Sequence, residues 1–328
     1  MSGIPLPRIG MGTAAIGNLY RAVSDDEARE TIVAALDAGI GYFDTAPYYG
    51  FGLAERRLGD ALAAESGRRA IVSTKIGRLL EPTSARGTRH GFVDADPFEP
   101  LFDYGADGVR RAHEASLKRL RRDRVEILFA HDLGAMTHGD QHERHRRAFL
   151  DGGYAAMRAL RDTGAVDAIG IGVNEVAIGL DLLPRVELDL ILLAGRYTLL
   201  DRNAADALFA LCAERGVRVI IGGPYNSGIL AQEDLSDAGA LHYDYEAPSP
   251  AMLSRARRLE DVCASHGVPL PAAALQFPLR HPRVATVIPG MVGASQVRDT
   301  LSRAATPVPD LLWKALDQAV TPSPDALS

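Results

Sequence analysis

The chain has 328 residues, of which 47% are hydrophobic and 24% are charged, and its formal net charge is −6. This acidic balance argues against a nucleic-acid-binding protein, because nucleic-acid-binding domains are usually basic. No apolar run reaches the roughly 18 residues of a membrane span, and no signal peptide is visible, so the sequence predicts a cytoplasmic protein without a membrane or nucleic-acid partner.

Short apolar segments of strand length recur along the chain, and helical patterns follow them. The predicted strands are residues 9–13, 40–43, 70–75, 125–130, 166–172, 188–193, 217–221 and 284–288. The segment 188–193 is almost continuously apolar, which is typical of a parallel strand covered on both faces. Eight strand–helix units in a chain of this size predict an α/β fold, a (β/α)8 TIM barrel, as a single domain over residues 1–328.

The predicted helices are delimited by capping residues and glycines. They are residues 25–38, 52–65, 107–121, 152–163, 175–183, 203–215, 252–265, 271–279, 294–303 and 309–319. The first helix begins at Ser24-x-x-Glu27, a capping box, and ends at Gly39.

Three long connections follow strands and therefore lie on the C-terminal face of the barrel, which carries the chemistry in such folds. They comprise residues 78–106, 132–150 and 223–250. Long irregular loops in a compact domain are usually binding loops or lids, with disordered insertions as the alternative. Their aromatic residues favour loops that pack over a bound molecule.

The glycines of the first strand imitate another fold. Gly10-x-Gly12-x-x-Ala15 approaches the dinucleotide-binding fingerprint of a doubly wound sheet. That fingerprint needs a helix directly after the glycines, and here the next helix starts only at residue 25. The barrel interpretation is therefore favoured.

Polar residues end three of the predicted strands. Asp44 follows strand 40–43, Lys75 ends the next strand and His131 ends the one after it, while Tyr49 lies in the loop beyond Asp44. The ends of neighbouring barrel strands converge on one face. Singly, each residue could cap a turn, pair at the surface or pack; together they suit proton transfer by a tuned tyrosine.

Several longer motifs occur in a fixed order. They are Gly39-Ile-Gly-Tyr-Phe-Asp44-Thr-Ala-Pro-Tyr-Tyr49-Gly50, Ser73-Thr-Lys75, His131, Gly170-Ile-Gly-Val-Asn174 and Val287-Ile-Pro-Gly290. With them the chain resembles the aldo-keto reductase superfamily over nearly its whole length. The segments 48–59, 131–134 and 195–200 are similar to the bacterial aldose 1-dehydrogenase branch, which contains L-fucose and D-threo-aldose dehydrogenases and a pyridoxal 4-dehydrogenase.

The resemblance implies hydride transfer between a nicotinamide and a carbonyl or alcohol carbon, with Asp44, Tyr49, Lys75 and His131 as catalytic residues. A neighbouring cation favours tyrosinate, so Lys75 would activate Tyr49. Asp44 would balance the buried lysine, and His131 would hold the substrate oxygen. In the oxidative direction Tyr49 would take a proton from the anomeric hydroxyl of a cyclic sugar, leaving a lactone.

The resemblance also implies a nicotinamide dinucleotide cofactor. The expected cofactor-binding residues are Gly12, Thr13, Asp44, Asn174, Tyr197, Gly222, Pro224, Tyr225, Ile288, Gly290 and Gln296. Asn174 matches the family residue that binds the carboxamide, although it could be only a turn residue. Gly222 stands where the family stacks an aromatic ring on the nicotinamide, so Tyr197 or Tyr225 is expected to stack instead. Ala194 stands where the family often has glutamine.

The segment that normally binds the 2′-phosphate of NADP departs from the family pattern. Gly290, Met291 and Gln296 occupy its positions, and the nearest arginine, Arg298, falls two residues later. Arginine binds phosphate bidentately and glutamine does not. We therefore expect NAD to be the preferred cofactor, with NADP possible.

Other candidate residues have two interpretations each. Phe51 and Trp313 are expected to join Tyr49 and His131 in binding substrate, although Phe51 could begin the next helix and Trp313 could pack in the core. The His-rich segment 131–145 has a spacing that zinc could use, but it lacks a His-Glu-x-x-His motif. Two cysteines add no metal motif, so no metal is expected.

The resemblance gives one favoured function and three alternatives. The favoured function is oxidation of an aldose of the L-fucose or D-threo-aldose type at C1. The alternatives are oxidation of pyridoxal to its lactone, a general aldehyde reductase, and a non-catalytic regulatory subunit like the potassium-channel β-subunits. The expected partners are a small-molecule substrate and, in a homo-oligomer, further copies of the chain.

Overall fold

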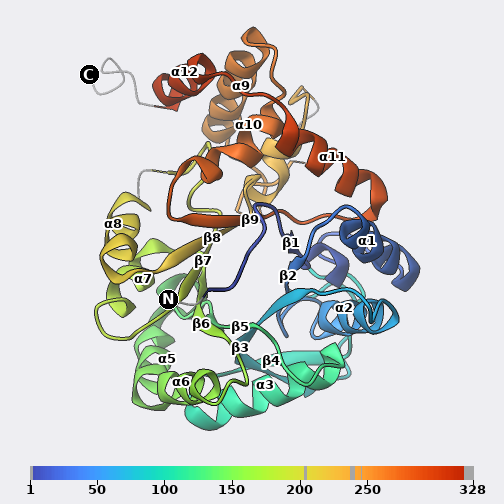
Figure 1. Cartoon of the computed structure of the whole chain (residues 1–328), viewed down its shortest axis with the longest axis vertical. Helices are drawn as coiled ribbons and strands as arrows, with labels where there is room; N and C mark the ends of the chain where they lie inside the picture. Colours follow the sequence, from blue (N-terminus) through green and yellow to red (C-terminus); the bar gives the residue numbers. More distant parts are fainter. Residues whose placement is uncertain (1–2, 203–204, 237–240, 245, 321–328) are drawn as a thin grey trace.

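A computed structural model describes residues 3–202, 205–236, 241–244 and 246–320. Eight parallel strands surround a central axis in the order β1-β2-β3-β5-β6-β7-β8-β9, and helices cover them on the outside (Figure 1). The strands are β1 (Met11–Gly12), β2 (Tyr42–Asp44), β3 (Ile71–Pro82), β5 (Ile127–His131), β6 (Ala168–Val173), β7 (Leu190–Ala194), β8 (Arg218–Gly222) and β9 (Val284–Ile288). The predicted (β/α)8 TIM barrel is confirmed.

The two ends of the chain close the barrel. Parallel bridges join Ile9 to Val287 and Gly12 to Gly290. The amide of Gly10 donates to the carbonyl oxygen of Val287 at 2.9 Å. The first and last strands of the barrel are therefore paired, although more than 270 residues separate Ile9 from Val287 along the chain.

Ten of the helices in the described ranges agree with the predicted ones to within a few residues, whereas two short helices in segment 132–150 were not predicted. The described helices are α1 (Asp25–Asp37), α2 (Leu53–Ala64), α3 (Ala106–Leu120), α4 (Ala135–His138), α5 (His142–Ala148), α6 (Tyr154–Asp162), α7 (Val176–Leu182), α8 (Asp206–Arg215), α9 (Pro250–Ser265), α10 (Leu270–Gln276), α11 (Gly293–Ala305) and α12 (Asp310–Val320). The predicted start of α8 at residues 203–204 lies outside the described residues. Helices α9 and α12 pack against each other beside the barrel (Figure 1).

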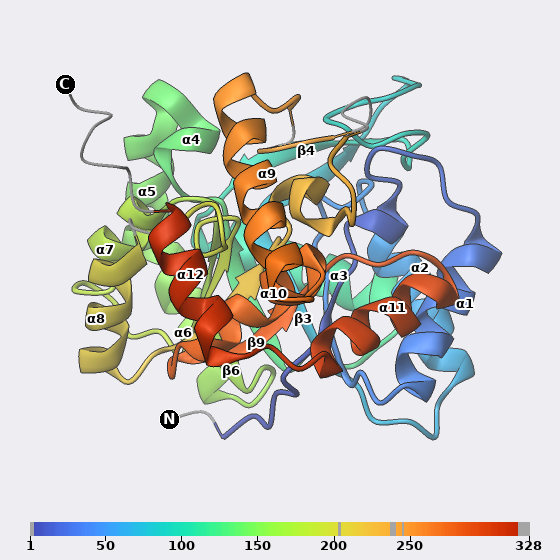
Figure 2. The same ribbon diagram turned by 90° about the horizontal axis from the view of Figure 1, so that it is seen from above.

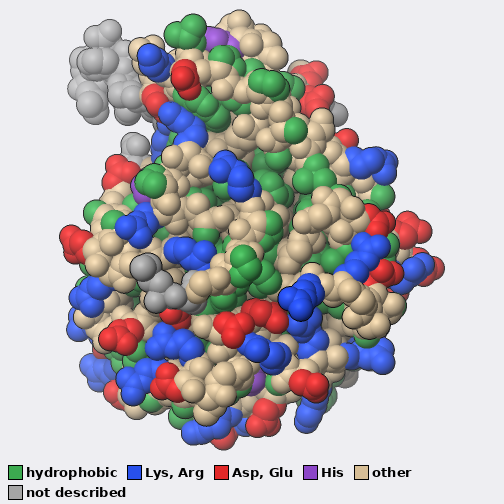
Figure 3. All heavy atoms as spheres, viewed as in Figure 1, with side chains coloured by type: hydrophobic (Ala, Val, Ile, Leu, Met, Phe, Trp, Pro, Cys, Tyr) green, Lys and Arg blue, Asp and Glu red, His purple; other side chains and the backbone are tan. Residues whose placement is uncertain are grey.

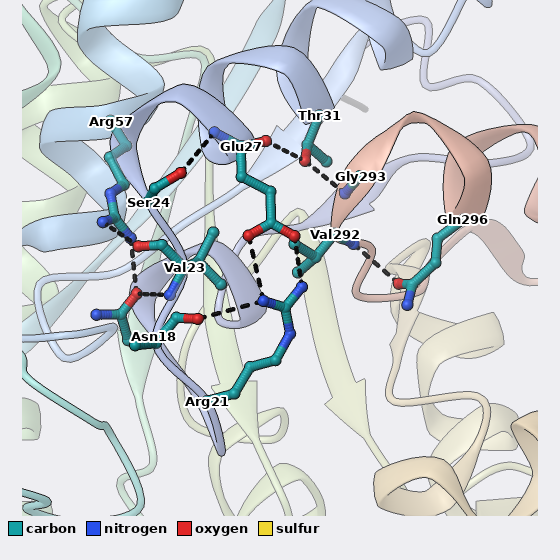
Figure 4. A network of polar contacts seen from close by, with 11 residues as sticks. Asn18, Arg21, Val23, Ser24, Glu27, Thr31, Arg57, Val292, Gly293 and Gln296 are labelled. Atoms are coloured by element: carbon teal, nitrogen blue, oxygen red, sulfur yellow. Dashed lines mark hydrogen bonds and ion pairs between the residues drawn. The ribbon is translucent and has the colours of Figure 1, made fainter.

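Only half of the predicted capping box at α1 forms. The Ser24 hydroxyl accepts a hydrogen bond from the amide of Glu27 at 3.1 Å, as an N-cap residue does. The Glu27 carboxylate binds Arg21 at 2.6 Å instead of the amide of Ser24 (Figure 4). The helix starts where it was predicted, with one of the two expected caps.

Side chains of the strands pack on both sides of the barrel wall. In β5, Ile127 and Phe129 belong to the cluster inside the barrel, whereas Leu128 and Ala130 belong to the larger cluster under the helices. The inner cluster consists of Ile4, Tyr42, Ile127, Phe129, Ala168, Leu190, Leu192, Ile220 and Ile288. Burial on both faces explains the continuously apolar strand sequences.

Two of the long connections predicted to be irregular contain regular structure, so the predicted irregularity is wrong for those parts, whereas residues 83–97 are largely irregular. Within 78–106, β3 continues to Pro82 and pairs antiparallel with β4 (Phe98–Asp103). Segment 132–150 forms α4, a 3₁₀ turn (Gly139–Gln141), α5 and the start of a π-helix (Phe149–Gly153). Figure 2 shows β4 and α4 at the end of the barrel opposite the N-terminus.

The reason for this error is tertiary. Phe102 of β4 and the neighbouring Tyr104 pack their rings against His138 and His145, so each segment orders the other. The third connection, 223–250, contains a 3₁₀ segment (Asn226–Ala231) and is otherwise largely irregular where it is described. Residues 237–240 and 245 of this connection lie outside the described residues.

The surface carries both signs of charge. Basic and acidic side chains are interspersed over the face seen in Figure 3, with hydrophobic groups between them. Ion pairs such as Arg124–Asp167, at 2.5 Å, account for part of this mixture. Of the helices in the described ranges, none is long and apolar enough to cross a membrane.

Candidate active site

Three of the four predicted catalytic side chains meet at one cation. Lys75 Nζ lies 2.6 Å from Asp44 Oδ2, 3.1 Å from the Tyr49 hydroxyl and 2.9 Å from the carbonyl oxygen of Thr45. Only 1% of Lys75 and 2% of Asp44 is exposed. Asp44 at the end of β2 and Lys75 within β3 thus hold an ammonium group directly against the phenol oxygen of Tyr49.

Asp44 is fixed by a second contact. The Ser73 hydroxyl donates to Asp44 Oδ1 at 2.7 Å and lies 2.9 Å from the Tyr42 hydroxyl. Burial raises the pKa of Asp44 and lowers the pKa of Lys75, and the contact between the two charges opposes both shifts. The pair therefore holds the lysine in place, because breaking a buried pair is costly.

Tyr49 does not carry the expected tyrosinate in the protein alone. Burial raises the pKa of Tyr49 well above its ordinary value of 10, and the charges of Asp44 and Asp132 raise it further. The charge of Lys75 is balanced by Asp44, so the predicted lowering of the pKa does not dominate. Tyr49 is a protonated phenol at neutral pH in this state.

His131 faces Tyr49 across the end of β5. The two rings are 5.9 Å apart between centroids, at an interplanar angle of 88°. Burial lowers the pKa of His131 well below its ordinary value, and Arg78 and Lys75 lower it further, so the imidazole is neutral. The four predicted catalytic residues therefore share one site.

A cavity of about 470 Å³ opens beside these residues. Tyr49, Lys75 and His131 line it together with further aromatic and charged side chains, several of them from the long connections. These additional residues are Tyr20, Tyr48, Arg78, His90, Phe92, Asp132, Asp244 and Glu246. The cavity thus combines aromatic surface with charged groups beside the predicted proton donor.

A second cavity of about 310 Å³ adjoins the first and shares Tyr49, Asn174, Ala194 and Asp244 with it. Most of the predicted cofactor-binding residues line this second cavity. They are Gly12, Asp44, Asn174, Gly222, Pro224, Tyr225, Ile288 and Gly290. The structure therefore brings the predicted catalytic and cofactor residues to one connected space at the strand ends.

The residues of this cavity fit a nicotinamide. Glycines from the ends of several strands line it, so a flat ring has room, and amide side chains border it at Asn174 and Asn226. Asn226 Oδ1 is buried and has no hydrogen-bond partner among the described residues. A buried acceptor without a partner is costly unless a ligand satisfies it, and the carboxamide of a nicotinamide can do so.

Buried Arg57 of α2 anchors the segment between β1 and α1. Its guanidinium donates to Asn18 Oδ1 at 2.8 Å and to the carbonyl oxygen of Val23 at 2.6 Å (Figure 4). This segment carries Leu19 and Tyr20, which line both cavities. Arg57, in the motif 48–59, therefore stabilises a segment that lines the cavities without lining them itself.

Two predicted residues lie away from both cavities. The Tyr197 ring packs against Phe209 and Phe277, at 4.6 and 5.1 Å between centroids. The chain turns at Gly195, whose φ is +68°, and carries Tyr197 towards α8. Trp313 lies in the cluster of α9, α10 and α12 because α12 packs on α9. Tyr225 is thus the predicted stacking residue that borders the cavity.

Three further predicted residues, Thr13, Phe51 and Gln296, do not line either cavity. Thr13 donates to the carbonyl oxygen of Asp44 at 2.9 Å. Phe51 is buried behind the wall, 5.8 Å from the ring of Phe92. Gln296 Oε1 accepts a hydrogen bond from the amide of Val292 at 2.9 Å, at the start of α11 (Figure 4).

The His-rich segment is organised by packing. His138 Nε2 lies 3.0 Å from the Tyr104 hydroxyl, and the rings of His138 and His145 are 4.3 Å apart. In the described part of the chain, no group of three His, Cys, Asp or Glu side chains is arranged to hold a metal ion. These histidines instead cover the β3–β4 hairpin.

Sequence reasoning missed Arg78 and Asp132. Arg78 Nη2 lies 2.9 Å from Asp132 Oδ2, and both side chains are largely buried. Asp132 directly follows the predicted His131, so its position was a usable signal. Arg78 follows Lys75 by three residues, but the strand was predicted to end at Lys75.

The profile of the Aldo/keto reductase family matches residues 8–321. The chain belongs to the aldo/keto reductase family. It is an NAD(P)-dependent oxidoreductase of small molecules.

Two curated relatives of this aldo-keto reductase are similar over nearly their full length. Pyridoxal 4-dehydrogenase of Microbacterium luteolum is 39% identical, with 96% of this chain and 94% of the relative covered. D-threo-aldose 1-dehydrogenase of a Pseudomonas species is also 39% identical, with 98% and 97% covered. L-galactose dehydrogenase of Arabidopsis thaliana is 29% identical, with 92% and 85% covered.

Among solved structures, the holo form of an aldo-keto reductase from Bacillus halodurans has a TM-score of 0.73 and 25% identity. The match covers 97% of this chain and 93% of that one. A glycerol dehydrogenase from Gluconobacter oxydans has a TM-score of 0.76 and 23% identity, with 98% and 94% covered, and shows the shared fold.

Proposed function

We propose that this aldo-keto reductase oxidises the C1 position of a cyclic aldose of the L-fucose or D-threo-aldose type to the lactone. The observation that carries the proposal is the charged lining of the larger cavity, where Arg78, Asp132, Asp244 and Glu246 border the space beside Tyr49. Carboxylates accept hydrogen bonds from sugar hydroxyls and a guanidinium donates to them. The 39% identical D-threo-aldose 1-dehydrogenase supports the same substrate class.

In this proposal Tyr49 takes the proton of the anomeric hydroxyl as C1 loses a hydride. Lys75, 3.1 Å from the phenol oxygen, stabilises the tyrosinate that accepts this proton, and Asp44 keeps the lysine in position. Neutral His131 holds the substrate oxygen beside Tyr49. A bound oxidised nicotinamide supplies the hydride acceptor and a positive charge that favours tyrosinate.

We also propose that NAD is preferred over NADP. At the start of α11, Gln296 is bonded to the amide of Val292 and Thr31 accepts from the amide of Gly293 at 2.7 Å (Figure 4). Gln296 stands where the family pattern has an arginine, and its amide brings no charge to a 2′-phosphate. The carboxylate of Glu27, one turn before Thr31 on α1, is paired with Arg21 at 2.6 Å.

Pyridoxal is the second candidate substrate. Tyr48, His90 and Phe92 line the same cavity, and such rings can stack on an aromatic substrate. The 39% identical pyridoxal 4-dehydrogenase points the same way. Both candidates present a cyclic hemiacetal carbon to Tyr49, so the chemistry at the reacting atoms is shared. A general aldehyde reductase would run this chemistry in reverse.

Absorbance of reduced nicotinamide tests these proposals directly. Purified protein is assayed with NAD or NADP and with L-fucose, D-arabinose, L-galactose, L-rhamnose and pyridoxal. We expect turnover of one sugar series and a higher kcat/KM with NAD than with NADP. Turnover of pyridoxal alone selects the second candidate, and a strong preference for NADP contradicts the cofactor proposal. No oxidation by a protein that binds the cofactor contradicts both substrates.

A further inference from the structure

Asp132 lies between the predicted catalytic histidine and two other polar side chains of the cavity. Its Oδ2 is 2.9 Å from Arg78 Nη2 and 3.4 Å from His131 Nε2, and its Oδ1 accepts from Asn174 Nδ2 at 3.4 Å. The backbone at Asp132 is left-handed, with a φ of +46°. Glycine adopts a left-handed conformation at less cost than aspartate does. What aspartate offers at this position, and glycine does not, is a carboxylate.

Among the described residues, no hydrogen bond to Nδ1 selects the tautomer of His131. Nδ1 is buried and has no hydrogen-bond partner in the ranges that the structure describes. A neutral imidazole carries one proton, and the surroundings of the two nitrogens decide which of them holds it. The carboxylate of Asp132 faces Nε2 at 3.4 Å, and a negative charge at that distance stabilises a proton on the nearer nitrogen.

We propose that Asp132 is a positioning residue that keeps the proton of His131 on Nε2. A histidine in this tautomer presents a donor towards the oxygen of a substrate beside Tyr49. With the proton on Nδ1, the same ring would present a lone pair to that oxygen and repel it. The choice of substrate rests on the proposed function, whereas the tautomer is a property of the protein alone.

Arg78 holds the carboxylate in this place. Only 4% of Arg78 is exposed, and its guanidinium lies over the rings of Tyr48 and Phe102, at 4.2 and 5.3 Å from their centroids. Its Nε and Nη1 have no hydrogen-bond partner among the described residues. The ion pair with Asp132 is therefore the polar contact that holds the guanidinium group in place. The two aromatic rings and the ion pair leave the carboxylate little freedom to turn away from His131.

The first measurement is the tautomer itself. Nitrogen-15 NMR of protein labelled at the histidine rings distinguishes a protonated from an unprotonated Nε2, and the spectrum of His131→Gln assigns the signal. We expect the Nε2-protonated form in the unmodified protein and a shift towards the Nδ1-protonated form in Asp132→Asn, which keeps the shape but removes the charge. An unchanged tautomer in Asp132→Asn overturns the proposal.

Asp189→Asn is the matched control. Asp189 also pairs with an arginine, at 2.8 Å from Arg161, but it lies at the start of β7, at the other end of the barrel. This variant should leave the signal of His131 unchanged. A loss of tautomer preference in Asp189→Asn would mean that any removed ion pair disturbs the ring, and it would count against the proposal.

Steady-state kinetics of Asp132→Asn provide a second test of the proposal. We expect kcat/KM of Asp132→Asn to fall roughly ten- to a hundredfold, mainly through kcat, with the Kd of the cofactor unchanged. If the single variant does not fold, the double variant Arg78→Met/Asp132→Asn removes both charges and leaves neither unpaired; the same tautomer shift is expected of it. The NMR measurement needs no substrate. It can therefore contradict the role of Asp132 without contradicting the proposed aldose oxidation, and the reverse also holds.

Discussion

The charge balance around one phenol oxygen decides the chemistry at the scale of single residues. The ammonium group of Lys75 contacts both the carboxylate of Asp44 and the phenol oxygen of Tyr49. Burial keeps Tyr49 protonated in the protein alone. For oxidation the lysine therefore acts by stabilising the phenolate form, which Tyr49 must adopt before it can accept the proton of the substrate.

Removing the phenol oxygen should remove the reaction and little else. Tyr49→Phe is expected to lower kcat by at least about 100-fold, because the proton acceptor is lost, and to leave the Kd of the cofactor nearly unchanged. Tyr154→Phe is the matched control, since that hydroxyl bonds to the backbone of Glu187 on the outer side of the barrel. Steady-state kinetics and a binding titration measure both; retained turnover in Tyr49→Phe would refute its role.

The raised pKa of Tyr49 sets the direction of the pH dependence. Oxidation needs the phenolate as a base, and the phenolate becomes more populated as the pH rises towards a high pKa. The logarithm of kcat/KM for sugar oxidation should therefore rise with pH, with a slope of up to about one between roughly pH 7 and pH 9. Reduction, which needs the phenol as an acid, should not rise over this range. An oxidation profile that falls with pH contradicts Tyr49 as the base.

At the scale of elements, the β3–β4 hairpin supports the end of β5. Tyr104, directly after β4, donates its hydroxyl to the carbonyl oxygen of His131 at 2.5 Å. The Tyr104 ring lies where a side chain at Gly77 would be, and Gly77 has a φ of +101°. Glycine at this position of β3 lets the hairpin close over the residue that carries the imidazole.

A pair of glycine substitutions separates conformation from packing in this hairpin. Gly87 also has a positive φ, of +82°, but no atom lies within 4 Å of the place of its Cβ. We expect Gly87→Ala to cost about 1–2 kcal/mol of stability for the left-handed backbone. Gly77→Ala should cost about 1–3 kcal/mol more, because its methyl group overlaps the Tyr104 ring.

Urea unfolding and kcat/KM measure the two variants. Gly77→Ala should also lower kcat/KM, because a displaced Tyr104 releases the carbonyl of His131. Gly87→Ala should keep the activity of the unmodified protein. Equal losses of stability and activity in the two variants would show that the contact with Tyr104 does not matter.

At the scale of the whole molecule, the barrel and the C-terminal helices share their packing. Tyr197 and Tyr225 pack both against the large cluster around the barrel and against the cluster that contains Trp313. The pairing of β9 with β1 further joins the ends of the barrel. We therefore propose that the chain behaves as one domain.

Because the barrel and the C-terminal helices pack against the same residues, we expect urea to unfold the chain in one cooperative transition. Trp313 is the only tryptophan, so its fluorescence reports the cluster of α9, α10 and α12, whereas far-ultraviolet circular dichroism reports all helices and strands. The two signals should change at the same urea concentration, as in a two-state transition. Loss of the fluorescence signal at a lower concentration would reveal a separate C-terminal unit.

The barrel, and the meeting of the four predicted catalytic residues in one site, could be predicted from local patterns in the sequence. Strands and helices could be predicted from local hydrophobic periodicity and capping residues, which act over a few positions. Asp44 and His131 end their strands, and Lys75 lies at the predicted end of a strand that continues to Pro82. Parallel strands in a barrel bring such residues together whatever the details of packing.

Only the tertiary structure decided the other features of the site. The β3–β4 hairpin depends on contacts between Tyr104 and residues 27 or more positions away, so no local sequence pattern predicted it. Tyr197 is carried away from the cavity by the turn at Gly195, and Trp313 by the packing of α12 on α9. The contact of Arg78 with Asp132 joins residues 54 positions apart. Burial and partner choice of this kind are properties of the folded chain, because they depend on which distant residues the barrel brings within a few ångströms.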